Sequence, residues 1–461
     1  MKQTLHRHST TVPDVAVTVQ SLPAELLCEI FMEALDASAV ALFNIMLFLW
    51  AFGHVCSRWR TIALSTPQLW QDIHIRGSQF RSTTKDRLTR MAFLEEWIAR
   101  SGECPLFVNL ELGRRIHREV VDLVTAQSPR WVEAEICSNL VHRGDMEGIR
   151  GNIPALRVLT IYMERMDFRE LDIRRPTTMI SRCFQIAPRL IRVHTNYAIF
   201  HFLPMPTDNL LELSFNVCFN LEIYELLRPC AAHLVKAWLD ARLPFTWTND
   251  TTPADAPRLL LPALELLSFC TDGKFIDMLT VPQLKTLNIS AFMPNNVPDA
   301  TPTPVPFGSS LNSFLSRSKC PLTHLTINVA TISSSELVNA FSALPLLEHL
   351  LLNDLHGLDS SFFVSITHTP GKTAPLLPRL EFFRFSHRFL EIHANFSPDP
   401  VLDFLESRLH SVDSPNQNPR LRMVQLTLPR ESVPVSSPQS LRFEALRAST
   451  SFKVIVFWSP Q

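Results

Sequence analysis

Residues that could carry out chemistry are few in this chain and are poorly spaced for it. Pro370–Thr373 reads Pro-Gly-Lys-Thr, as at the end of a phosphate-binding loop, but that loop requires a glycine where Ile366 stands. His387 and His393 lie on either side of Glu391, and a solvated strand end explains them better than a metal site. The sequence contains no H-E-x-x-H, G-x-S-x-G or protein-kinase signature. We therefore expect no catalytic residues, no metal and no cofactor.

The nine cysteines form neither a disulfide framework nor a zinc-binding pattern. Their number is odd, they are scattered along the chain, and no two are spaced as C-x-x-C. Buried free thiols in a reducing compartment are the simplest interpretation. Residues 1–13 are polar and lack the apolar core of a signal peptide. Together these features predict a protein of the cytoplasm, the nucleus or both.

Composition and charge narrow the class of protein further. The 461 residues contain 43 Lys and Arg against 44 Asp and Glu, and the net charge of -1 argues against nucleic acid as a partner. A count of 11 glycines against 34 prolines disfavours a glycine-rich nucleotide-binding core. The apolar run Val40–Phe52 is about thirteen residues long, whereas a membrane-spanning helix needs roughly twenty. We expect a buried helix there and no membrane partner.

A leucine-rich pattern recurs along most of the chain. Its form is Pro-x-Leu-x-x-Leu-x-Leu with conservative replacements, and the distance between successive copies varies. Clear copies start at Pro154, Pro262, Pro282, Pro345, Pro378 and Pro419, and a weaker copy starts at Pro188. This spacing excludes a repeat of fixed length but allows one strand in each unit of variable length.

The pattern is typical of a strand whose alternate side chains enter one core. In one copy, Leu264, Leu267 and Phe269 are expected to point inward. Because proline cannot donate a ladder hydrogen bond, each proline is expected where its strand begins. Helix-like stretches such as 335–342 and 400–409 lie between the copies. One strand and one helix per unit predict an irregular leucine-rich-repeat horseshoe with a parallel sheet, and an ordinary α/β domain is the alternative.

The segment before the first clear copy shows the same alternation of helices and strands. Periodicity predicts a first strand carrying Ile73 and Ile75, and a helix over Arg87–Arg100 with its stop at Ser101-Gly102. Further along, it predicts a strand at 106–110, a helix at 120–126 and a strand at 131–136. These elements are interpreted as early, degenerate repeats.

The N-terminal segment predicts two amphipathic helices. The first begins near Pro23, which suits a first turn because it has no N–H, and Glu25 is favourable at the positive end of the helix dipole. Its apolar stripe consists of Leu26, Leu27, Ile30, Phe31, Ala34 and Leu35. The second helix places Val55, Cys56, Trp59, Ile62 and Ala63 on one face and stops before Pro67.

These residues resemble an F-box, in particular the F-box-like form found in large fungal families. The resemblance is carried by Leu22-Pro23-x-Glu25, Ile30-Phe31, Val55-Cys56-x-x-Trp59-Arg60 and Ser65-Thr66-Pro67-x-Leu69-Trp70, which together span about fifty residues. One departure is Phe43–Phe52, which is longer and more apolar than the family's joining stretch. It is a buried extra turn, a partner-facing surface or sequence foreign to the functional protein. A generic helical hairpin is the alternative to the F-box as a whole.

The resemblance implies a function. F-box-like helices bind the Skp adaptor of a cullin ubiquitin ligase, and the repeat domain would then hold a protein substrate. The adaptor-binding residues implied in this sequence are Leu22, Pro23, Ile30, Phe31, Val55 and Trp59. Two other classes stay open. One is a non-catalytic structural or interaction protein whose F-box-like segment no longer recruits a ligase, and the other is an enzyme with an unrecognised site.

The expected organisation is an α/β chain in three parts. Residues 1–20 form a disordered lead-in, residues 21–70 a small all-helical F-box-like domain, and residues 71–461 an irregular leucine-rich-repeat solenoid. A proline-rich loop at 294–306 interrupts the solenoid.

The candidate substrate surface is the face of the strands that the inward leucines leave free. Positions between those leucines are expected on the concave side of the horseshoe, where repeat arrays commonly bind partners. They include Arg192, His194, Asn196, Asn288, His324, Asn328, His349, Asn353 and Arg384. Because most are neutral hydrogen-bonding groups, the composition favours a polar or mildly acidic peptide over a strongly charged ligand. A solvated sheet without a ligand is the alternative.

Overall fold

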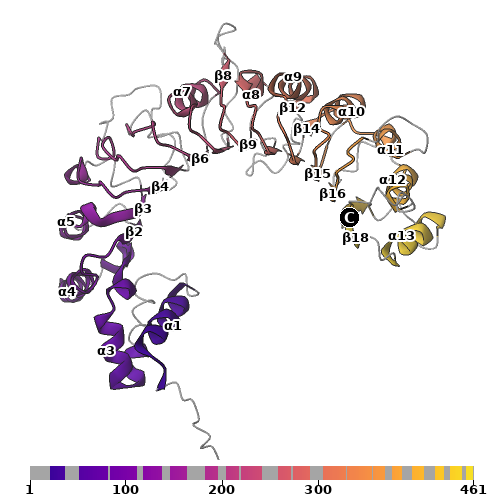
Figure 1. The fold of residues 1–461 in the computed structure, drawn as a ribbon. Helices are drawn as coiled ribbons and strands as arrows, with labels where there is room; N and C mark the ends of the chain where they lie inside the picture. The colour runs from indigo at the N-terminus through magenta and orange to yellow at the C-terminus, as the bar shows by residue number, and fades with distance from the viewer. Residues whose placement is uncertain are drawn as a thin grey trace, which may run out of the picture. The chain divides into compact units, whose positions relative to one another are not determined.

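The chain folds into two compact units, residues 1–140 and 141–461. The computed structural model describes residues 21–36, 51–80, 84–111, 118–137, 146–162, 182–195, 204–216, 220–240, 258–270, 274–290, 305–328, 330–355, 357–368, 376–386, 397–409, 421–429, 437–448 and 453–459. Helices and strands alternate in both units (Figure 1). The predicted mixed α/β class, with an N-terminal helical region and a large parallel sheet, is therefore confirmed.

The first unit begins with the predicted helices. They are α1 (Ala24–Asp36), a helical stretch at 51–55, α3 (Ser57–Ser65) and the 3-10 turn η2 (Pro67–Trp70). The first turn of α1 forms where Leu27 N–H donates to the Pro23 carbonyl at 3.2 Å, and Glu25 lies at the positive end of the helix. The Cys56 thiol caps α3 by accepting from Trp59 N–H at 3.4 Å. The helix start predicted near Pro23 is thus confirmed. The second helix was predicted to carry Val55 and Cys56, but Val55 ends the separate stretch at 51–55 and α3 begins only after its cap, Cys56.

Three strands complete the first unit. These are β1 (Asp72–Arg76), β2 (Leu106–Glu111) and β3 (Trp131–Cys137), with α4 (Thr84–Arg100) and α5 (Arg118–Thr125) between them. Both strand pairings are parallel, and the register shifts once, between Leu106 and Phe107. Ile73 and Ile75 are buried in β1, and Trp97 of α4 is buried against Trp70. The strand predicted to carry Ile73 and Ile75 and the helix predicted at Arg87–Arg100 are both confirmed. They belong to the same compact unit as the N-terminal helices.

The second unit is a parallel sheet in which nearly every strand neighbours the next one in the chain. In order across the sheet, the strands are β4 (Val158–Tyr162), β5 (Arg192–Thr195), β6 (Glu212–Asn216), β7 (Lys236–Asp240), β9 (Leu266–Cys270), β11 (Thr286–Ser290), β13 (His324–Asn328), β15 (His349–Asn353), β16 (Phe382–Ser386), β17 (Met423–Pro429) and β18 (Lys453–Ser459). The omitted numbers belong to two-residue strands, which pair as β8 (Leu259–Leu260) with β10 (Leu279–Thr280) and β12 (Val305–Pro306) with β14 (Ala330–Thr331).

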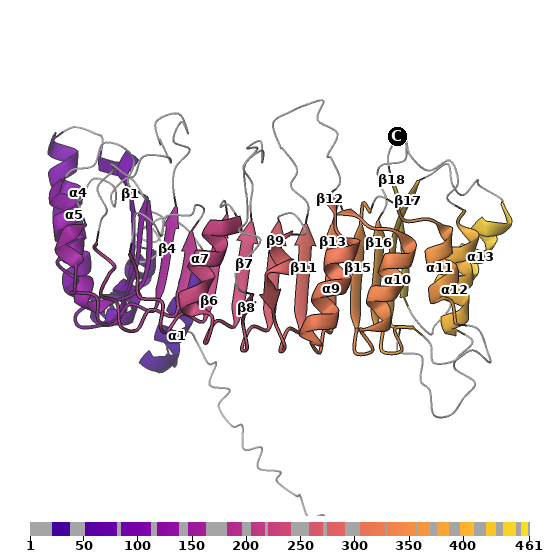
Figure 2. The same ribbon diagram turned by 90° about the horizontal axis from the view of Figure 1, so that it is seen from above.

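Helices cover one face of this sheet. They are α7 (Asn220–Cys230), α8 (Lys274–Asp277), α9 (Gly308–Ser318), α10 (Ser334–Ser342), α11 (Ser360–Ile366), α12 (Asp399–Leu409) and α13 (Pro438–Ala448). Figure 2 shows them as one layer lying in front of the strands. The core lies between the layers, because alternate strand residues such as Leu325 and Ile327 are fully buried. In the part of the second unit that the structure describes, no helix covers the other face of the sheet, which we call the open face.

The repeated leucine pattern has a consistent structural meaning. The first leucine of each copy is buried just before its strand; examples are Leu264, Leu284 and Leu347. The preceding proline lies in a turn, and the Leu347 N–H closes that turn by donating to the Leu344 carbonyl at 3.3 Å. Each strand then begins two residues after the buried leucine. For the copies whose proline is described, which leaves out Pro419, the prediction that the proline precedes its strand is confirmed.

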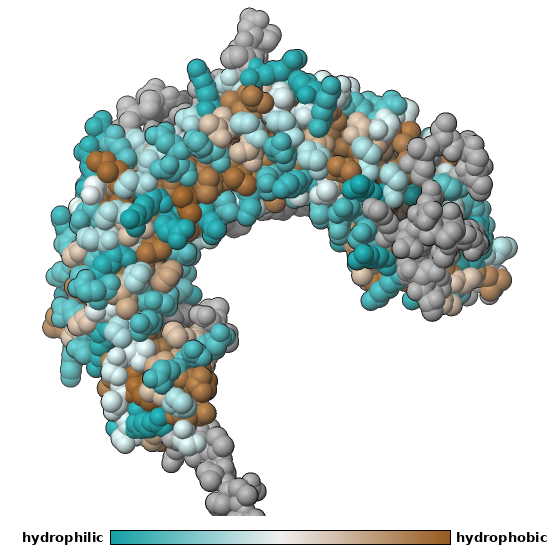
Figure 3. All heavy atoms as spheres, in the orientation of Figure 1, coloured by the Kyte–Doolittle hydropathy of each residue, from teal (hydrophilic) through white to brown (hydrophobic). Residues whose placement is uncertain are grey.

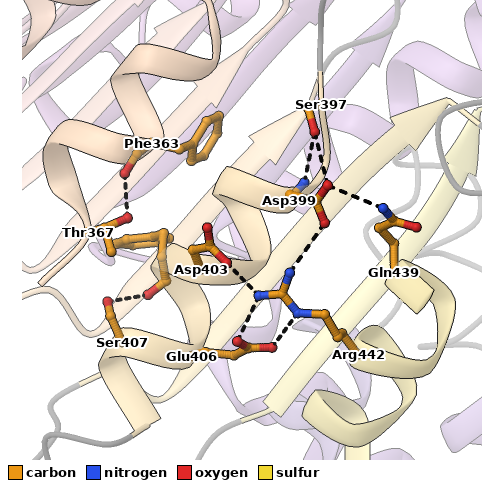
Figure 4. A network of polar contacts seen from close by, with 10 residues as sticks. Phe363, Thr367, Ser397, Asp399, Asp403, Glu406, Ser407, Gln439 and Arg442 are labelled. Atoms are coloured by element: carbon orange, nitrogen blue, oxygen red, sulfur yellow. Dashed lines mark hydrogen bonds and ion pairs between the residues drawn. The ribbon is translucent and has the colours of Figure 1, made fainter.

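The last two helices are joined by charged groups (Figure 4). Arg442 of α13 donates to both carboxylate oxygens of Glu406 at 2.8 and 2.7 Å, to Asp403 at 2.6 Å and to Asp399 at 3.3 Å. The hydrogen bonds that Arg442 donates to Glu406 and then to Asp403 raise the pKa of its guanidinium above the usual range. Gln439 adds a contact to Asp399 at 3.2 Å, so α13 is anchored to α12 at two points.

Several sequence predictions concern segments that the structure covers only in part. Of Val40–Phe52, only residues 51 and 52 are described, so its predicted burial lies mostly outside the described residues. Of the proline-rich loop at 294–306, only Val305–Pro306 is described, and these two residues form β12. Asn196 lies outside the described residues. The domain boundary at residue 70 stays a prediction.

Candidate functional site

Helix α1 presents an apolar stripe on its exposed side. Pro23, Leu26 and Ile30 follow the i, i+3, i+7 spacing of one helix face. Leu26 is 44% exposed and Ile30 is 47% exposed. Large aliphatic side chains gathered on one exposed face are the usual mark of a surface that another protein covers.

The opposite side of α1 forms the core of the helical segment. Phe31 is fully buried, stacks on Phe52 with ring centroids 4.3 Å apart, and meets Trp59 edge-on at 5.0 Å. Leu27, one turn before Phe31, is also fully buried. The three aromatic rings therefore hold α1, the stretch at 51–55 and α3 together.

Polar contacts tie the ends of these helices to one another. Arg58 of α3 donates a short hydrogen bond to the Leu22 carbonyl, just before α1. The Cys28 thiol lies 3.2 Å from the Thr66 hydroxyl, and Trp70 Nε1–H donates to the Ala63 carbonyl at 2.9 Å. The start of α1 is thus tied to the start of α3, and the middle of α1 is tied to the residue after α3, which gives the exposed stripe a defined position.

The six residues predicted to bind the adaptor divide into two groups. Phe31 is buried and Trp59 and Leu22 are half-buried, whereas Pro23, Ile30 and Val55 are exposed. Two further exposed leucines, Leu26 and Leu64 at 42% exposure, were not among the six. Leu26 was recognisable as part of the stripe, but its neighbour Leu27 has the same chemistry and is buried. Figure 3 shows hydrophobic side chains gathered over α1 and α3.

The open face of the second unit carries three rows of side chains across β11, β13, β15, β16 and β17. Residues in register lie side by side on adjacent strands. The first row is Thr286, His324, His349, Phe382 and Met423. The middle row is Asn288, Thr326, Leu351, Arg384 and Gln425. The third row is Ser290, Asn328, Asn353, Ser386 and Thr427.

The first row contains a column of stacked rings. The His324 and His349 rings are parallel to within 7° with centroids 4.2 Å apart, and Phe382 continues the stack 5.8 Å from His349. The Thr323 hydroxyl lies 2.8 Å from His324 Nδ1. Burial, together with the neighbouring His349, lowers the pKa of His324, so this ring is neutral at pH 7. The column is therefore an aromatic surface of low charge.

The third row is a ladder of side-chain hydrogen bonds. Asn353 Nδ2–H donates to Asn328 Oδ1 at 2.6 Å, and Asn328 Nδ2–H donates to Ser290 Oγ at 3.0 Å. The Asn353 Oδ1 atom is buried and accepts no hydrogen bond from the described residues. This end of the ladder therefore lies below the surface of the open face.

Charged groups on the open face are paired over β5, β6 and β7. Glu212 accepts Arg192 at 3.1 Å and Lys236 at 2.9 Å. His194, in the row beside them, has its pKa lowered chiefly by burial, and its ring lies 6.5 Å from the Trp238 ring. These strands thus present two cations that share one carboxylate, next to the His194 and Trp238 rings.

Most of the predicted substrate-face residues are brought together, and several neighbours were missed. Asn288, His324, Asn328, His349, Asn353 and Arg384 lie on adjacent strands of one face, while Arg192 and His194 lie further along the sheet. The sequence list kept polar residues only, and so omitted Leu351, Phe382 and Trp238, which occupy equivalent strand positions. The alternation that identified the polar residues could have found these three as well.

The described residues contain no metal-binding cluster: no three His, Cys, Asp or Glu side chains among them lie close enough to bind one ion. All cysteines within that part are free thiols. Burial raises the pKa of Cys230 to about 12 and that of Cys320 to about 11, so neither is a reactive thiolate at pH 7. Among the described helices, none is both long and apolar enough to cross a bilayer.

Comparison with known families identifies one segment of the chain. Residues 19–76 match the family model for F-box-like domains. The match contains α1, α3, η2 and the exposed stripe of Pro23, Leu26 and Ile30, and it ends with β1. No match to a curated protein was found for the chain.

Proposed function

We propose that this chain is the substrate-recognition subunit of a Skp–cullin–F-box ubiquitin ligase. In this proposal the F-box-like helices bind the Skp-type adaptor and the second unit binds a protein substrate. The match to F-box-like domains over residues 19–76 is the observation that carries it. F-box proteins are typically non-catalytic receptors, so ubiquitin transfer would be performed by the other subunits. Such a subunit would work in the cytoplasm, the nucleus or both.

The exposed stripe of α1 is the proposed contact with the adaptor. It is apolar, lies inside the matched segment and is held in place by the buried Phe31 ring and the half-buried Phe52 and Trp59 rings. Pro23, Ile30 and Val55 are therefore assigned to contact, and Phe31 and Trp59 to positioning the helix. Leu22 has a mixed role, because its carbonyl accepts from Arg58.

The second unit is proposed to be an irregular leucine-rich-repeat solenoid whose open face binds the substrate. The parallel strands, the one-sided helix layer and the repeated buried leucines support that assignment. Arg192, His194, Asn196, Asn288, His324, Asn328, His349, Asn353 and Arg384 are the proposed substrate-face residues. The alternative is an interaction protein whose F-box-like segment no longer recruits a ligase.

Substitution of the exposed stripe tests the adaptor contact directly. Leu26→Ala combined with Ile30→Ala removes exposed apolar surface, and exposed substitutions usually change stability by about 0.5 kcal/mol or less. We expect the amount of Skp-type adaptor that co-purifies with the chain to fall by tenfold or more, while the melting temperature of the chain stays unchanged. Phe31→Ala is the contrasting variant, because emptying a buried Phe site costs about 3–5 kcal/mol and lowers the melting temperature. Full adaptor binding by the folded double variant would refute the assignment of this stripe.

A further inference from the structure

Arg384 stands out among the charged residues of the open face. It lies in the middle row of β16, half-buried, and within the part of the chain that the structure describes it makes no ion pair or hydrogen bond. Arg192 and Lys236 on the same face share the carboxylate of Glu212. Because its guanidinium is half-buried, it has lost part of its hydration without pairing with a described carboxylate. An anion from a ligand would restore that lost interaction.

The neighbours of Arg384 define the chemistry of that ligand on both sides. In the first row Phe382 and Met423 form an apolar edge, and Ile455 of β18 lies in register with Gln425 in the middle row. A half-buried cation that makes no ion pair or hydrogen bond with the described residues therefore lies beside an apolar edge on adjoining strands. A peptide supplies a matching pair, since it can carry a carboxylate side chain next to an apolar side chain.

The few positive charges on this part of the face favour an anion with a single negative charge. In the three rows across β11, β13, β15, β16, β17 and β18, the described residues include two full cations, Arg384 and Lys453, and no carboxylate. Lys453 is exposed and lies two strands from Arg384. His324 adds no charge, because burial lowers its pKa. One guanidinium balances the single charge of one carboxylate, whose two oxygens fit its planar fork, whereas it leaves part of the charge of a phosphate without a partner.

We propose that Arg384 binds the carboxylate of an Asp or Glu side chain in the protein substrate, and that Phe382, Met423 and Ile455 contact an apolar side chain one or two residues away. The proposal rests on the proposed function as a substrate-recognition subunit and specifies the substrate class as a peptide segment with an isolated acid beside an apolar residue.

A peptide array probed with the full chain tests this proposal. Its members are twelve-residue neutral peptides of varied sequence, each carrying a single Glu within two residues of a Leu, Ile or Phe. Every member has three matched versions, with Gln, Lys or phosphoserine in place of the Glu. We expect the wild-type chain to bind the best Glu members at least about tenfold more tightly than their Gln versions. A ratio of that size corresponds to the loss of one hydrogen-bonded contact to a charged group.

Variants at Arg384 assign that preference to one residue. Arg384→Gln should abolish the difference between Glu and Gln versions, and Arg384→Glu should shift binding to the Lys versions. Arg422→Gln is the matched control, because Arg422 is an exposed cation just before β17 that pairs with Glu381 and lies outside the three rows. It should retain the wild-type preference. Thermal melts of all three variants establish that each is folded.

The outcomes separate this inference from the proposed function. Equal binding of Glu and Gln versions by the wild type, survival of the preference in Arg384→Gln, or tenfold tighter binding of phosphoserine versions would each overturn the carboxylate site. Co-purification with the Skp-type adaptor is measured on the same proteins. If the adaptor binds and no Glu preference exists, the inference fails and the ligase role stands. If the Glu preference holds and the adaptor does not bind, the ligase role fails and the peptide site stands.

Discussion

Individual residues with nearly the same chemistry take opposite roles in this protein. Ile30 and Phe31 are adjacent in α1, yet Ile30 is 47% exposed and Phe31 is fully buried. The sequence predicts both as apolar positions of one broad stripe, and it does not contain the information that divides them. That division depends on where Phe52 and Trp59 lie, which is a property of the packed segment.

A residue-scale prediction concerns the acid dependence of stability through Asp359. This carboxylate caps α11 by accepting from Ser361 N–H at 3.0 Å and also accepts from the Ser334 hydroxyl at 2.7 Å. The hydrogen bonds from Ser361 and then Ser334 lower its pKa in the folded chain. A lowered folded pKa means that the stabilisation is present above the usual carboxyl range and is lost as the pH falls through the folded value.

Replacement of Asp359 by Asn isolates that contribution. Asn is an equally good N-cap, so Asp359→Asn keeps the cap and removes the charge. Because the side chain is exposed, we expect a cost of only about 0.5 kcal/mol in the free energy of unfolding at pH 7. Urea unfolding of both proteins at stepwise lower pH should show the difference shrinking toward zero. A constant difference from pH 7 down to pH 4 and below would contradict the assignment.

At the scale of elements, the sequence predicts much of the structure. The strands at 106–110 and 131–136 and the helices at 335–342 and 400–409 correspond to β2, β3, α10 and α12 with boundaries shifted by about one residue. Local periodicity and turn residues are sufficient for these elements. The contacts between neighbouring strands cannot be predicted in the same way. The stacking of His324 on His349 requires that β13 and β15 be in register, and repeats of variable length do not reveal that register.

An element-scale prediction concerns the close contact between α9 and α10 at Gly308. The capping box of α10 holds the Glu336 carboxylate against Ser333 N–H at 3.0 Å and the Ser333 hydroxyl at 2.7 Å. A Cβ atom at Gly308 would overlap this carboxyl group. Gly308→Ala must therefore displace Glu336 and break the capping box. We expect a loss of about 1 kcal/mol in the free energy of unfolding, despite the higher helix propensity of Ala.

A double-mutant cycle tests the cause of that loss. Glu336→Ala removes the carboxylate and should by itself cost about 1 kcal/mol. In that background Gly308→Ala should be neutral or slightly stabilising, because the obstacle is gone. Additive losses, measured by urea unfolding of the four proteins, would show that Gly308 is needed for a different reason.

At the scale of the whole molecule, one contact recurs between successive repeats in both units. Arg130, Arg317 and Arg408 each donate to backbone carbonyls at the end of the helix in the preceding repeat, which is α4 for Arg130, α8 for Arg317 and α11 for Arg408. Their acceptors include the carbonyls of Ser101 at 3.2 Å, Ile276 at 3.0 Å and Ile366 at 3.4 Å. Burial lowers the pKa of all three guanidinium groups. Each arginine thus satisfies carbonyls that a helix leaves unpaired, and joins two neighbouring repeats by doing so.

Loss of one such arginine should therefore loosen the chain locally rather than everywhere. Arg408 also donates to the Leu376 carbonyl at 2.8 Å, and burial lowers its pKa to about 10, which leaves it charged at pH 7. Arg408→Met should lower the free energy of unfolding by about 2–3 kcal/mol, because it removes hydrogen bonds from a charged group and leaves their buried carbonyl acceptors unpaired. Arg447→Met is the matched control, because among the described residues Arg447 pairs only with the exposed Glu444 at 3.5 Å, and its loss should lower the free energy of unfolding by about 0.5 kcal/mol or less. In a stack where each repeat contacts its neighbours, hydrogen exchange should then accelerate in α11, α12 and β16 of Arg408→Met and stay unchanged in β9 and β11. Uniform acceleration across all these strands would instead mean that the second unit unfolds as a single cooperative body.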